Sequence, residues 1–497
     1  MTRRAKSGFS TEAPAPELIE AGFALEVADA PLLHWGLNLA DIAHVMVLRE
    51  QAIVPEEAAR RLLEVLLEMV RIPAEAFPYD PAFGDPYNSR ERYIAERLGD
   101  DAGWLHAGRP RREAGRIALR LMLRRQVATL IADSAGFVSA VADIAQANAD
   151  TFIPDQTYLQ QAQPSTFGHY VLTFAFPALR DTERLHAAME WVNRSPGGAG
   201  CVNGSRLAIS RDRGAELLGF GGVIEHTRDA MWQTDGLIDL LATAASLLTN
   251  MSKLAEDLEI WDSAEFDFVD LAGPFTRASV LMPQKRNPYA LSIVRGAAGV
   301  LIGRVSGFLS VVKTPSARSD NLIFAYGEVP RALDLACRVT RLMAGVVATL
   351  HVNRERMWGS LLGGFSQATD LAEFVMQTCA VDYRTAYQVV GTTVRRAAAE
   401  GLRGVDVTGE MLDRAAVEVI GRELGLTGRD LTEVLDPREI VLTRSSAGGA
   451  APDVVREMAR SVRERAERTR DDAARALAAI DDVERELVEM AEAELTR

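Results

Sequence analysis

The chain has 497 residues, 48% of them hydrophobic and 25% charged, and a formal net charge of −14. This is the usage of ordinary globular proteins, so the composition excludes disordered, collagen-like and small disulfide-rich chains. The acidic balance argues against a nucleic-acid partner, because phosphate contacts need clustered Lys and Arg. It still leaves room for a local basic pocket that binds a small anion.

Cysteines, histidines and apolar runs set further limits. The cysteines Cys201, Cys337 and Cys379 lie far apart in the sequence, which is typical of free thiols in a reducing compartment. The 7 histidines follow no metal-ligand spacing, so we expect neither a metal nor another cofactor. No uncharged apolar run reaches membrane-spanning length, and no apolar stretch follows the basic residues 1–10. We therefore expect a cytoplasmic protein without a membrane partner.

The first segments of the chain predict an arm followed by helices. Residues 1–16 contain Ala-Pro-Ala-Pro, which indicates a mobile arm. Residues 54–70 carry Pro-Glu-Glu near their start and apolar side chains on one face, which predicts a helix. The glycine-rich stretches 197–200 and 361–364 lack the strand context of a nucleotide-binding loop, so they predict connections between helices.

Two long apolar seams predict a helix bundle in an all-α fold. They follow residues 237–260 and 294–312, with apolar side chains at alternating steps of three and four. Apolar residues beside the first seam widen its stripe, namely Leu241, Ala245, Leu248 and Ala255. A long helix inside a monomer is one interpretation, but the wide stripe favours a bundle shared between subunits. Residues 471–495 predict one last amphipathic helix.

The segment 277–288, RASVLMPQKRNP in one-letter code, is the most informative for chemistry. It reads as a loop with two prolines that brings a hydroxyl, an ammonium and an amide together just before a long helix. A polar surface loop is the simplest interpretation. The segment also offers hydrogen-bonding groups suited to a carboxylate, which favours a functional loop.

This segment resembles the signature GSSxMPxKxNP of the aspartase/fumarase superfamily, with departures at Ala278 and Val280. The resemblance is closest to argininosuccinate lyase. Residues 105–113, LHAGRPRRE, look like that family's LHTGRSRND, and residues 156–164, QTYLQQAQP, look like its YTHLQxAQP. Further similar segments follow in the family's order at 365–372, 435–437 and 445–452.

The resemblance implies a three-domain, all-α fold in which long central helices form the twenty-helix core of a homotetramer. Each active site would then be a composite of three subunits. The domains implied are a flexible arm at 1–16, an N-terminal helical domain at 17–106, a central bundle at 107–355, and a C-terminal helical domain with a terminal amphipathic helix at 356–497.

The resemblance also implies a carbon–nitrogen lyase that eliminates fumarate from an N-substituted aspartate, or adds an amine to fumarate in reverse. Ser279 matches the family's catalytic base, which removes a Cβ proton, and Lys285 would supply a nearby cation. The candidate donors to the succinyl carboxylates are Asn287, Thr157, Arg111 and Gln163. A loop that closes over the substrate would exclude water.

Two residues of the family's acid–base machinery are replaced together. Tyr158 stands where the family has a histidine, and Ser292 stands where it has the glutamate that pairs with this histidine. Tyr158 could donate a proton to the leaving group, orient a carboxylate, or be a packed aromatic. A basic amine can also depart already protonated, so a dedicated acid is not required.

The residues that hold the arginine part of argininosuccinate are altered too. The family's segment PLAYNRDLQEDK corresponds to residues 315–326, where its three binding positions become Arg318, Ile323 and Tyr326. Arg112 replaces the asparagine of LHTGRSRND. Because a polar site tolerates the loss of its partners badly, we expect a substrate other than argininosuccinate.

The replacements indicate what the amine part carries. Arg112 and Arg318 suit additional carboxylates, although each could instead form a structural salt bridge, and Ile323 makes one wall apolar. We expect an acidic or partly apolar amine part. The chain thus also resembles ethylenediamine-disuccinate lyase, a relative that handles amino-polycarboxylates.

Other functions stay open at this point: argininosuccinate lyase proper, another lyase or cycloisomerase of the superfamily, and a catalytically silent structural tetramer. The replaced histidine and glutamate favour the silent tetramer. Retention of Ser279, Lys285 and Asn287 favours the lyase, because a silent scaffold has no use for this triplet.

Overall fold

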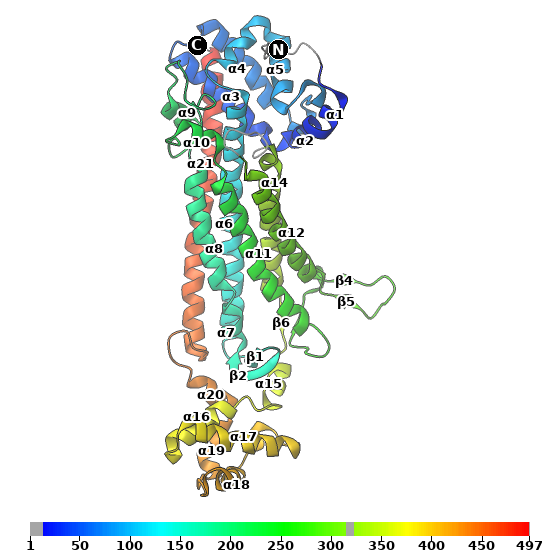
Figure 1. The fold of residues 1–497 in the computed structure, drawn as a ribbon, viewed down its shortest axis with the longest axis vertical. Helices are drawn as coiled ribbons and strands as arrows, with labels where there is room; N and C mark the ends of the chain where they lie inside the picture. The colour runs from blue at the N-terminus through cyan, green and yellow to red at the C-terminus, as the bar shows by residue number, and fades with distance from the viewer. Residues whose placement is uncertain (1–12, 315–322, 497) are drawn as a thin grey trace, which may run out of the picture.

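The computed structural model describes residues 13–314 and 323–496. The molecule is elongated, with a helical head at one end, a long bundle in the middle and a small group of helices at the far end (Figure 1). The fold is all-α, as the sequence predicts, and its short strands form two-stranded pairs. Most of the predicted arm, and Arg318, lie outside the described residues.

The head, residues 13–109, packs at the N-terminal end of the bundle. Its helices are α1 (Pro16–Leu18), α2 (Ala24–Ala28), α3 (Ala30–Glu50), α4 (Glu56–Val70) and α5 (Pro86–Leu98). Two short helices lie beside it, α9 (Arg211–Leu217) and α10 (Thr227–Trp232) (Figure 1). The helix predicted at 54–70 is therefore confirmed as α4, with Pro55 as its N-cap.

The bundle contains the long helices. They are α6 (Arg111–Ala147), α8 (Ala175–Val192), α11 (Asp235–Trp261), α12 (Tyr289–Val312), α14 (Ala325–Ala348) and α21 (Pro452–Thr496), with the short α7 (Phe167–Leu172) at the far end. The distal group, residues 354–442, consists of α15 (Arg354–Leu362), α16 (Ala368–Cys379), α17 (Tyr383–Ala399), α18 (Gly409–Ile420), α19 (Gly428–Leu435) and α20 (Pro437–Leu442).

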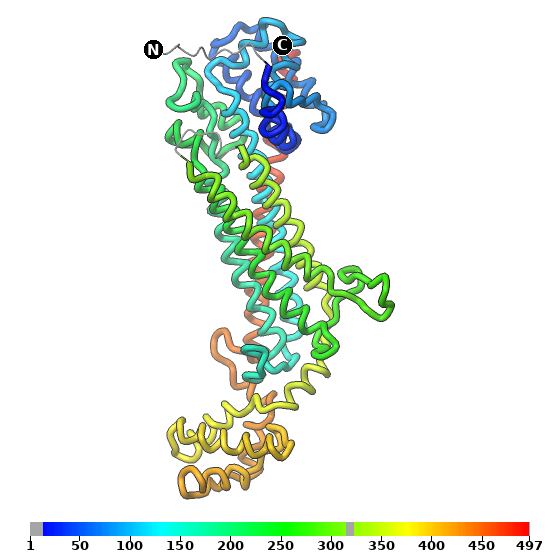
Figure 2. The backbone as a smooth tube through the Cα atoms, turned by 45° about the vertical axis from the view of Figure 1, so that its right-hand side comes forward, coloured from blue at the N-terminus to red at the C-terminus, as the bar shows by residue number. Residues whose placement is uncertain are grey.

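The strands pair antiparallel at the edges of the bundle. They are β1 (Phe152–Thr157) with β2 (Gln160–Thr166), β3 (Val269–Asp270) with β6 (His351–Val352), and β4 (Arg277–Ala278) with β5 (Arg286–Asn287). The β4–β5 pair stands away from the side of the bundle in both views (Figures 1 and 2).

The two predicted seams belong to α11 and α12, which pack against each other. All seven seam residues of α11 are buried: Leu237, Leu240, Ala244, Leu247, Met251, Leu254 and Leu258. The flanking residues Leu241, Ala245, Leu248 and Ala255 are also buried within the same chain. They therefore give no indication of subunit contacts, contrary to the interpretation of the wide stripe.

Helix α12 has one buried and one exposed apolar face. Val294 and Leu301 are buried, whereas Val300 is 48% exposed, Ile302 54% and Leu309 45%. By length and composition alone, α6 and α12 could cross a membrane. Both helices contain arginines, which is why the sequence shows no uncharged run of that length. More than half of the apolar window of α6 is buried, as in the core helix of a soluble protein.

The last helix is longer than predicted. Helix α21 begins at Pro452 and runs back along α6 towards the head, so that the C-terminus lies near the N-terminal helices (Figures 1 and 2). Arginines and acids dominate residues 452–470 and hide the buried apolar positions Val455, Ala459 and Val462. The periodicity was therefore visible only further along the helix.

A buried charge network fixes the start of α6. Asp41 is fully buried and contacts the guanidinium groups of both Arg109 and Arg90, the latter at 2.7 Å. The Tyr87 hydroxyl donates to the same carboxylate at 2.7 Å, and Arg90 also donates to Asn38 at 2.7 Å. Because Arg109 lies two residues before Arg111, where α6 begins, this network anchors the helix turn that carries Arg111 and Arg112.

Candidate active site

Within one chain, the described site residues predicted from the sequence fall into three separate groups. Arg111, Arg112 and Tyr326 lie at the head end of the bundle, Thr157, Tyr158 and Gln163 lie on the β1–β2 hairpin at its far end, and Ser279, Lys285 and Asn287 lie on the β4–β5 hairpin. Helix α6 spans 37 residues between the first two groups, or roughly 55 Å at 1.5 Å per residue. One chain alone therefore does not bring the three groups together.

The loop between β4 and β5 is held by its own backbone. The Met282 backbone N–H donates to Ser279 Oγ at 3.0 Å, the Ser279 N–H donates to the Lys285 carbonyl at 3.2 Å, and the Asn287 amide donates to the Arg277 carbonyl at 2.9 Å. Lys285 is exposed, and no hydrogen bond or ion pair of its ammonium exists within the described residues. The Lys285 ammonium is thus open to the outside of the chain, whereas the Ser279 hydroxyl is half-buried on the same loop.

The turn of the β1–β2 hairpin has an unusual backbone. Tyr158 and Leu159 have φ angles of 55° and 58°, a left-handed conformation that non-glycine residues seldom adopt. Such strain persists where the surroundings impose it, often at functional sites. The Tyr158 side chain is 98% exposed, so it is not a packed aromatic within its own chain. Thr157 and Gln163 are exposed on the same hairpin.

Arg111, Arg112, Ile323 and Tyr326 line one cavity at the head end of the bundle, which we call the head cavity. The Arg111 guanidinium pairs with Asp85 at 3.2 Å and donates to the side chain of Asn88 at 2.8 Å. No hydrogen bond or ion pair of the Arg112 guanidinium exists in the described parts of the chain, so the structural salt bridge that the sequence left open is absent there.

Sequence reasoning missed the acids of this cavity. Glu26, Asp29 and Asp85 line it together with the arginines. Burial and the neighbouring Asp85 carboxylate raise the pKa of Glu26, against the opposing effect of Arg112 and Arg111. Glu26 lies on the short α2, where no motif or periodicity marks it, so no signal in the sequence could have found it. The cavity is therefore mixed in charge rather than simply cationic.

A carboxylate lies beside Ser292, although the family's glutamate is absent there. The Ser292 hydroxyl donates to Glu259 of the neighbouring α11 at 3.3 Å. Arg295 pairs with the same carboxylate at 2.5 Å. A comparison of aligned positions could not reveal this carboxylate, because Glu259 lies one helix earlier in the chain than Ser292.

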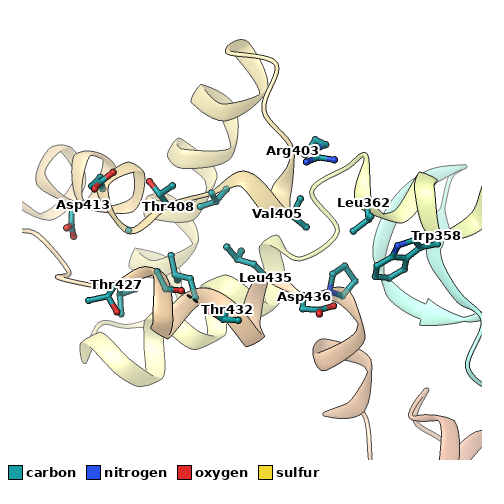
Figure 3. Close-up of a pocket in the computed structure, with 17 residues that line it drawn as sticks. Trp358, Leu362, Arg403, Val405, Thr408, Asp413, Thr427, Thr432, Leu435 and Asp436 are labelled. Carbon is teal, nitrogen blue, oxygen red and sulfur yellow. Dashed lines mark hydrogen bonds between the residues drawn. The ribbon is translucent and has the colours of Figure 1, made fainter.

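A separate open cleft of about 900 Å³ lies among the distal helices and next to α15 (Figure 3). It is lined by the first residues of α18, α19 and α20 and by Trp358, and none of the described predicted site residues reaches it. Three of its polar side chains are already engaged, since Thr408 and Thr427 cap their own helices and Arg403 pairs with Asp406. The cleft is thus separate from the predicted chemistry.

Comparison with known proteins adds to this geometry. A family model described as lyase matches residues 39–303, and a model described as argininosuccinate lyase C-terminal matches residues 365–442. The argininosuccinate lyases of Methanothrix thermoacetophila and Methanococcoides burtonii are each 34% identical to the chain. These two alignments cover 84% and 86% of this chain, and 85% and 86% of those proteins.

Solved structures agree with the sequence relatives. A structure of an EDDS lyase variant with bound fumarate has a TM-score of 0.86 and 27% identity, covering 98% of this chain and 97% of that one. The 3-carboxy-cis,cis-muconate lactonizing enzyme from Pseudomonas putida has a TM-score of 0.69 at 19% identity, over 91% of this chain and 99% of that one. The second likeness concerns the fold alone.

The long-helix bundle, the projecting loop and these matches define an all-α lyase of the aspartase/fumarase superfamily, an enzyme that cleaves carbon–nitrogen bonds. More narrowly, the chain belongs to the argininosuccinate lyase family. Enzymes of this superfamily use small anionic substrates such as fumarate and typically act as homotetramers.

Proposed function

We propose that the protein eliminates fumarate from an N-substituted aspartate, or adds an amine to fumarate in the reverse direction. The observation that carries this proposal is the β4–β5 loop, which carries the half-buried Ser279 and the exposed Lys285, whose ammonium has no partner in the described chain. A silent scaffold would have no reason to keep these groups together on an ordered turn.

In the proposed reaction, Ser279 acts as an alkoxide stabilised by the nearby Lys285 cation, and its Oγ removes a proton from Cβ of the succinyl group. The electron pair of the C–H bond forms the double bond of fumarate, and the C–N bond breaks with its pair going to the amine. Charge develops on the carboxylate next to Cβ, so donors must stabilise it in a water-poor site. Asn287, Thr157, Gln163 and Arg111 are the proposed donors.

The leaving amine takes up a separate proton as the C–N bond breaks. Tyr158 is the proposed donor on the β1–β2 hairpin, and its exposure leaves the hydroxyl free to reach a substrate. A strongly basic amine could also leave without it. Loss of the proton donor would then affect weakly basic amines most. These amines are not already protonated, so without a donor they would have to depart as anions, which are poor leaving groups.

We further propose that the site is a composite of several subunits in a homotetramer. The separation of the three residue groups along one chain supports this, and so does the exposed apolar face of α12. Long helices with exposed apolar faces are stable when another copy covers them. The domain boundaries and the cytoplasmic location given above stay predictions.

The amine part is proposed to differ from arginine, because the residues expected to hold arginine are replaced. Argininosuccinate is the second candidate, favoured by relatives that carry this name at 34% identity. Fumarate mixed with arginine, aspartate, ammonia, diamines or apolar amino acids, followed by mass spectrometry of the products, distinguishes the two.

One preferred adduct would identify the amine, and an arginine adduct would establish argininosuccinate as the substrate instead. If no amine forms an adduct while the tetramer is intact, the proposal of a carbon–nitrogen lyase acting on aspartates fails. The matched control is the Ser279→Ala variant, which should form every adduct far more slowly than the wild type.

A further inference from the structure

Two charged side chains in the head cavity have no partner within the described residues. Neither the Glu26 carboxylate nor the Arg112 guanidinium makes a hydrogen bond or ion pair there. They influence each other electrostatically, but their charged atoms are more than 4.0 Å apart, since no salt bridge joins them. One anion and one cation are therefore open to a ligand in the same cavity.

The other charges of the cavity are already compensated. Asp29 pairs with Arg331 at 2.5 Å, and Asp85 pairs with Arg111 at 3.2 Å. Asp85 also accepts from two backbone N–H groups at the start of α5. Glu26 and Arg112 thus stand out as the groups with unused hydrogen-bonding capacity.

Tyr326 adds a donor to the cavity. Its hydroxyl oxygen accepts from the Arg116 guanidinium at 3.1 Å, and a guanidinium can only donate. The hydroxyl hydrogen of Tyr326 is therefore free for an acceptor. Gly115 leaves room for this ring, because a Cβ at that position would lie 3.1 Å from the hydroxyl oxygen.

We propose that the head cavity binds the far end of the substrate's amine part as a zwitterion, with its ammonium on Glu26 and its carboxylate on Arg112 and Tyr326. This assignment rests on the proposed function, which gives the amine part a place in the site. It makes Glu26, which no motif marks, a residue that determines substrate specificity. The apolar side chains of Leu33, Leu37 and Ile323 suit an aliphatic chain between the two ends.

The mixed charge argues against simpler ligands. An amine part that carried carboxylates alone would approach Glu26 with like charge, and a diamine without a carboxylate would leave Arg112 uncompensated. Burial and Asp85 already disfavour the charged form of Glu26 and raise its pKa, so a ligand cation relieves an existing cost. A zwitterion satisfies both groups at once.

The test measures binding by calorimetry, on the assembled protein, with three probes of similar length. Ornithine carries a chain amine together with an α-ammonium and a carboxylate, 5-aminopentanoate lacks the α-ammonium, and 1,4-diaminobutane lacks the carboxylate. We expect ornithine to bind at least about ten-fold more tightly than either, as charge-assisted hydrogen bonds add to affinity.

The variants assign each charge. Glu26→Gln should weaken ornithine and 1,4-diaminobutane by roughly 10-fold or more while leaving 5-aminopentanoate unchanged. Arg112→Gln should do the reverse, weakening the two probes that carry a carboxylate. Glu26→Asp should restore part of the affinity, and Glu20→Gln, an exposed acid outside the cavity, should change nothing. Circular dichroism and light scattering show whether each variant keeps its fold and its assembly.

Equal binding of all three probes, or an unchanged affinity of Glu26→Gln for ornithine, overturns the assignment. Adduct formation with fumarate is measured in parallel so that the two proposals fail separately. If adducts form with an amine whose binding does not depend on Glu26, the zwitterion assignment is rejected and the lyase proposal stands. Binding that depends on Glu26 without any adduct would keep the cavity assignment and reject the lyase reaction.

Discussion

The buried network around Asp41 and the exposed β4–β5 loop differ in how far their polar side chains are paired within the chain. In the head, every guanidinium that faces Asp41 is engaged inside the chain, at the helix start that it anchors. On the loop, the Ser279 hydroxyl receives one backbone N–H and the Lys285 ammonium has no partner in the described chain. Polar groups satisfied within the chain serve the fold, and those left open are available to a substrate or to another copy.

The two regions also differ in what assembly would change. The Asp41 network is sealed inside one chain, so association should leave it unaffected. The loop stands away from the bundle (Figure 2), and its chemistry needs a surrounding wall that one chain does not supply.

The largest effect is expected from a charge on the exposed face of α12. Ile302→Glu should prevent tetramer formation and with it all activity, because an acid replaces a side chain that another copy would cover. Light scattering after gel filtration measures the mass. The control Val417→Glu replaces a residue of similar exposure on α18 and should leave the tetramer intact. An active Ile302→Glu tetramer would show that the active site does not depend on this face.

Ser279→Ala should lower kcat by about 10²–10⁴-fold, the usual range for a lost general base. Stability should change little, since the hydroxyl accepts one backbone N–H on an exposed loop. The control Ser263→Ala removes a hydroxyl that donates to the Ile260 carbonyl at the end of α11, and its kinetics should match the wild type. Retained turnover in Ser279→Ala would remove the serine from the mechanism.

Asp41→Asn should lower the free energy of unfolding by about 3–5 kcal/mol, because two buried guanidinium groups lose their counter-charge. Guanidinium denaturation at pH 7 measures this, with the exposed Asp453→Asn as a control expected to cost under about 1 kcal/mol. A small loss in Asp41→Asn would mean that the network is not what holds the start of α6.

The same variant has a pH signature. Burial opposes ionisation of Asp41, but Arg109 and Arg90 outweigh it and lower the pKa below the ordinary value of 3.8. A lowered pKa in the folded state gives stability that is present above pH 3.8 and disappears as the pH falls through the lower, folded-state value. The difference between wild type and Asp41→Asn should therefore be constant near neutrality and shrink in acid.

The sequence predicts the bundle well because the apolar spacing that drives helix packing is visible within each helix. The seam of α11 repeats every three or four residues, and each seam residue is buried as expected. The loop 277–288 was equally visible, since its groups are neighbours in the chain and resemble a known signature. Helix α21 was found only in part, because its charged surface masked the apolar positions of its first half.

Features that depend on tertiary packing could not be predicted. Glu26 reaches the head cavity from a five-residue helix with no pattern of its own, and Glu259 reaches Ser292 from the preceding long helix. The flanking residues of α11, read as a sign of subunit contacts, are buried by the same chain instead. Periodicity tells which face is covered but not which element covers it.

The smallest effect is expected from mixing two variants, which tests whether the loop and the head cavity of one active site come from the same chain or from different chains. Mixing the inactive variants Ser279→Ala and Arg112→Gln during assembly should restore activity in about a quarter of the sites, if each site takes its loop and its head cavity from different copies chosen at random. Mixing Ser279→Ala with Lys285→Ala should restore none, because both changes lie on the same loop. The measured quantity is activity per tetramer after co-refolding. Recovery in the second mixture, or none in the first, would contradict a site whose loop and head cavity belong to different subunits.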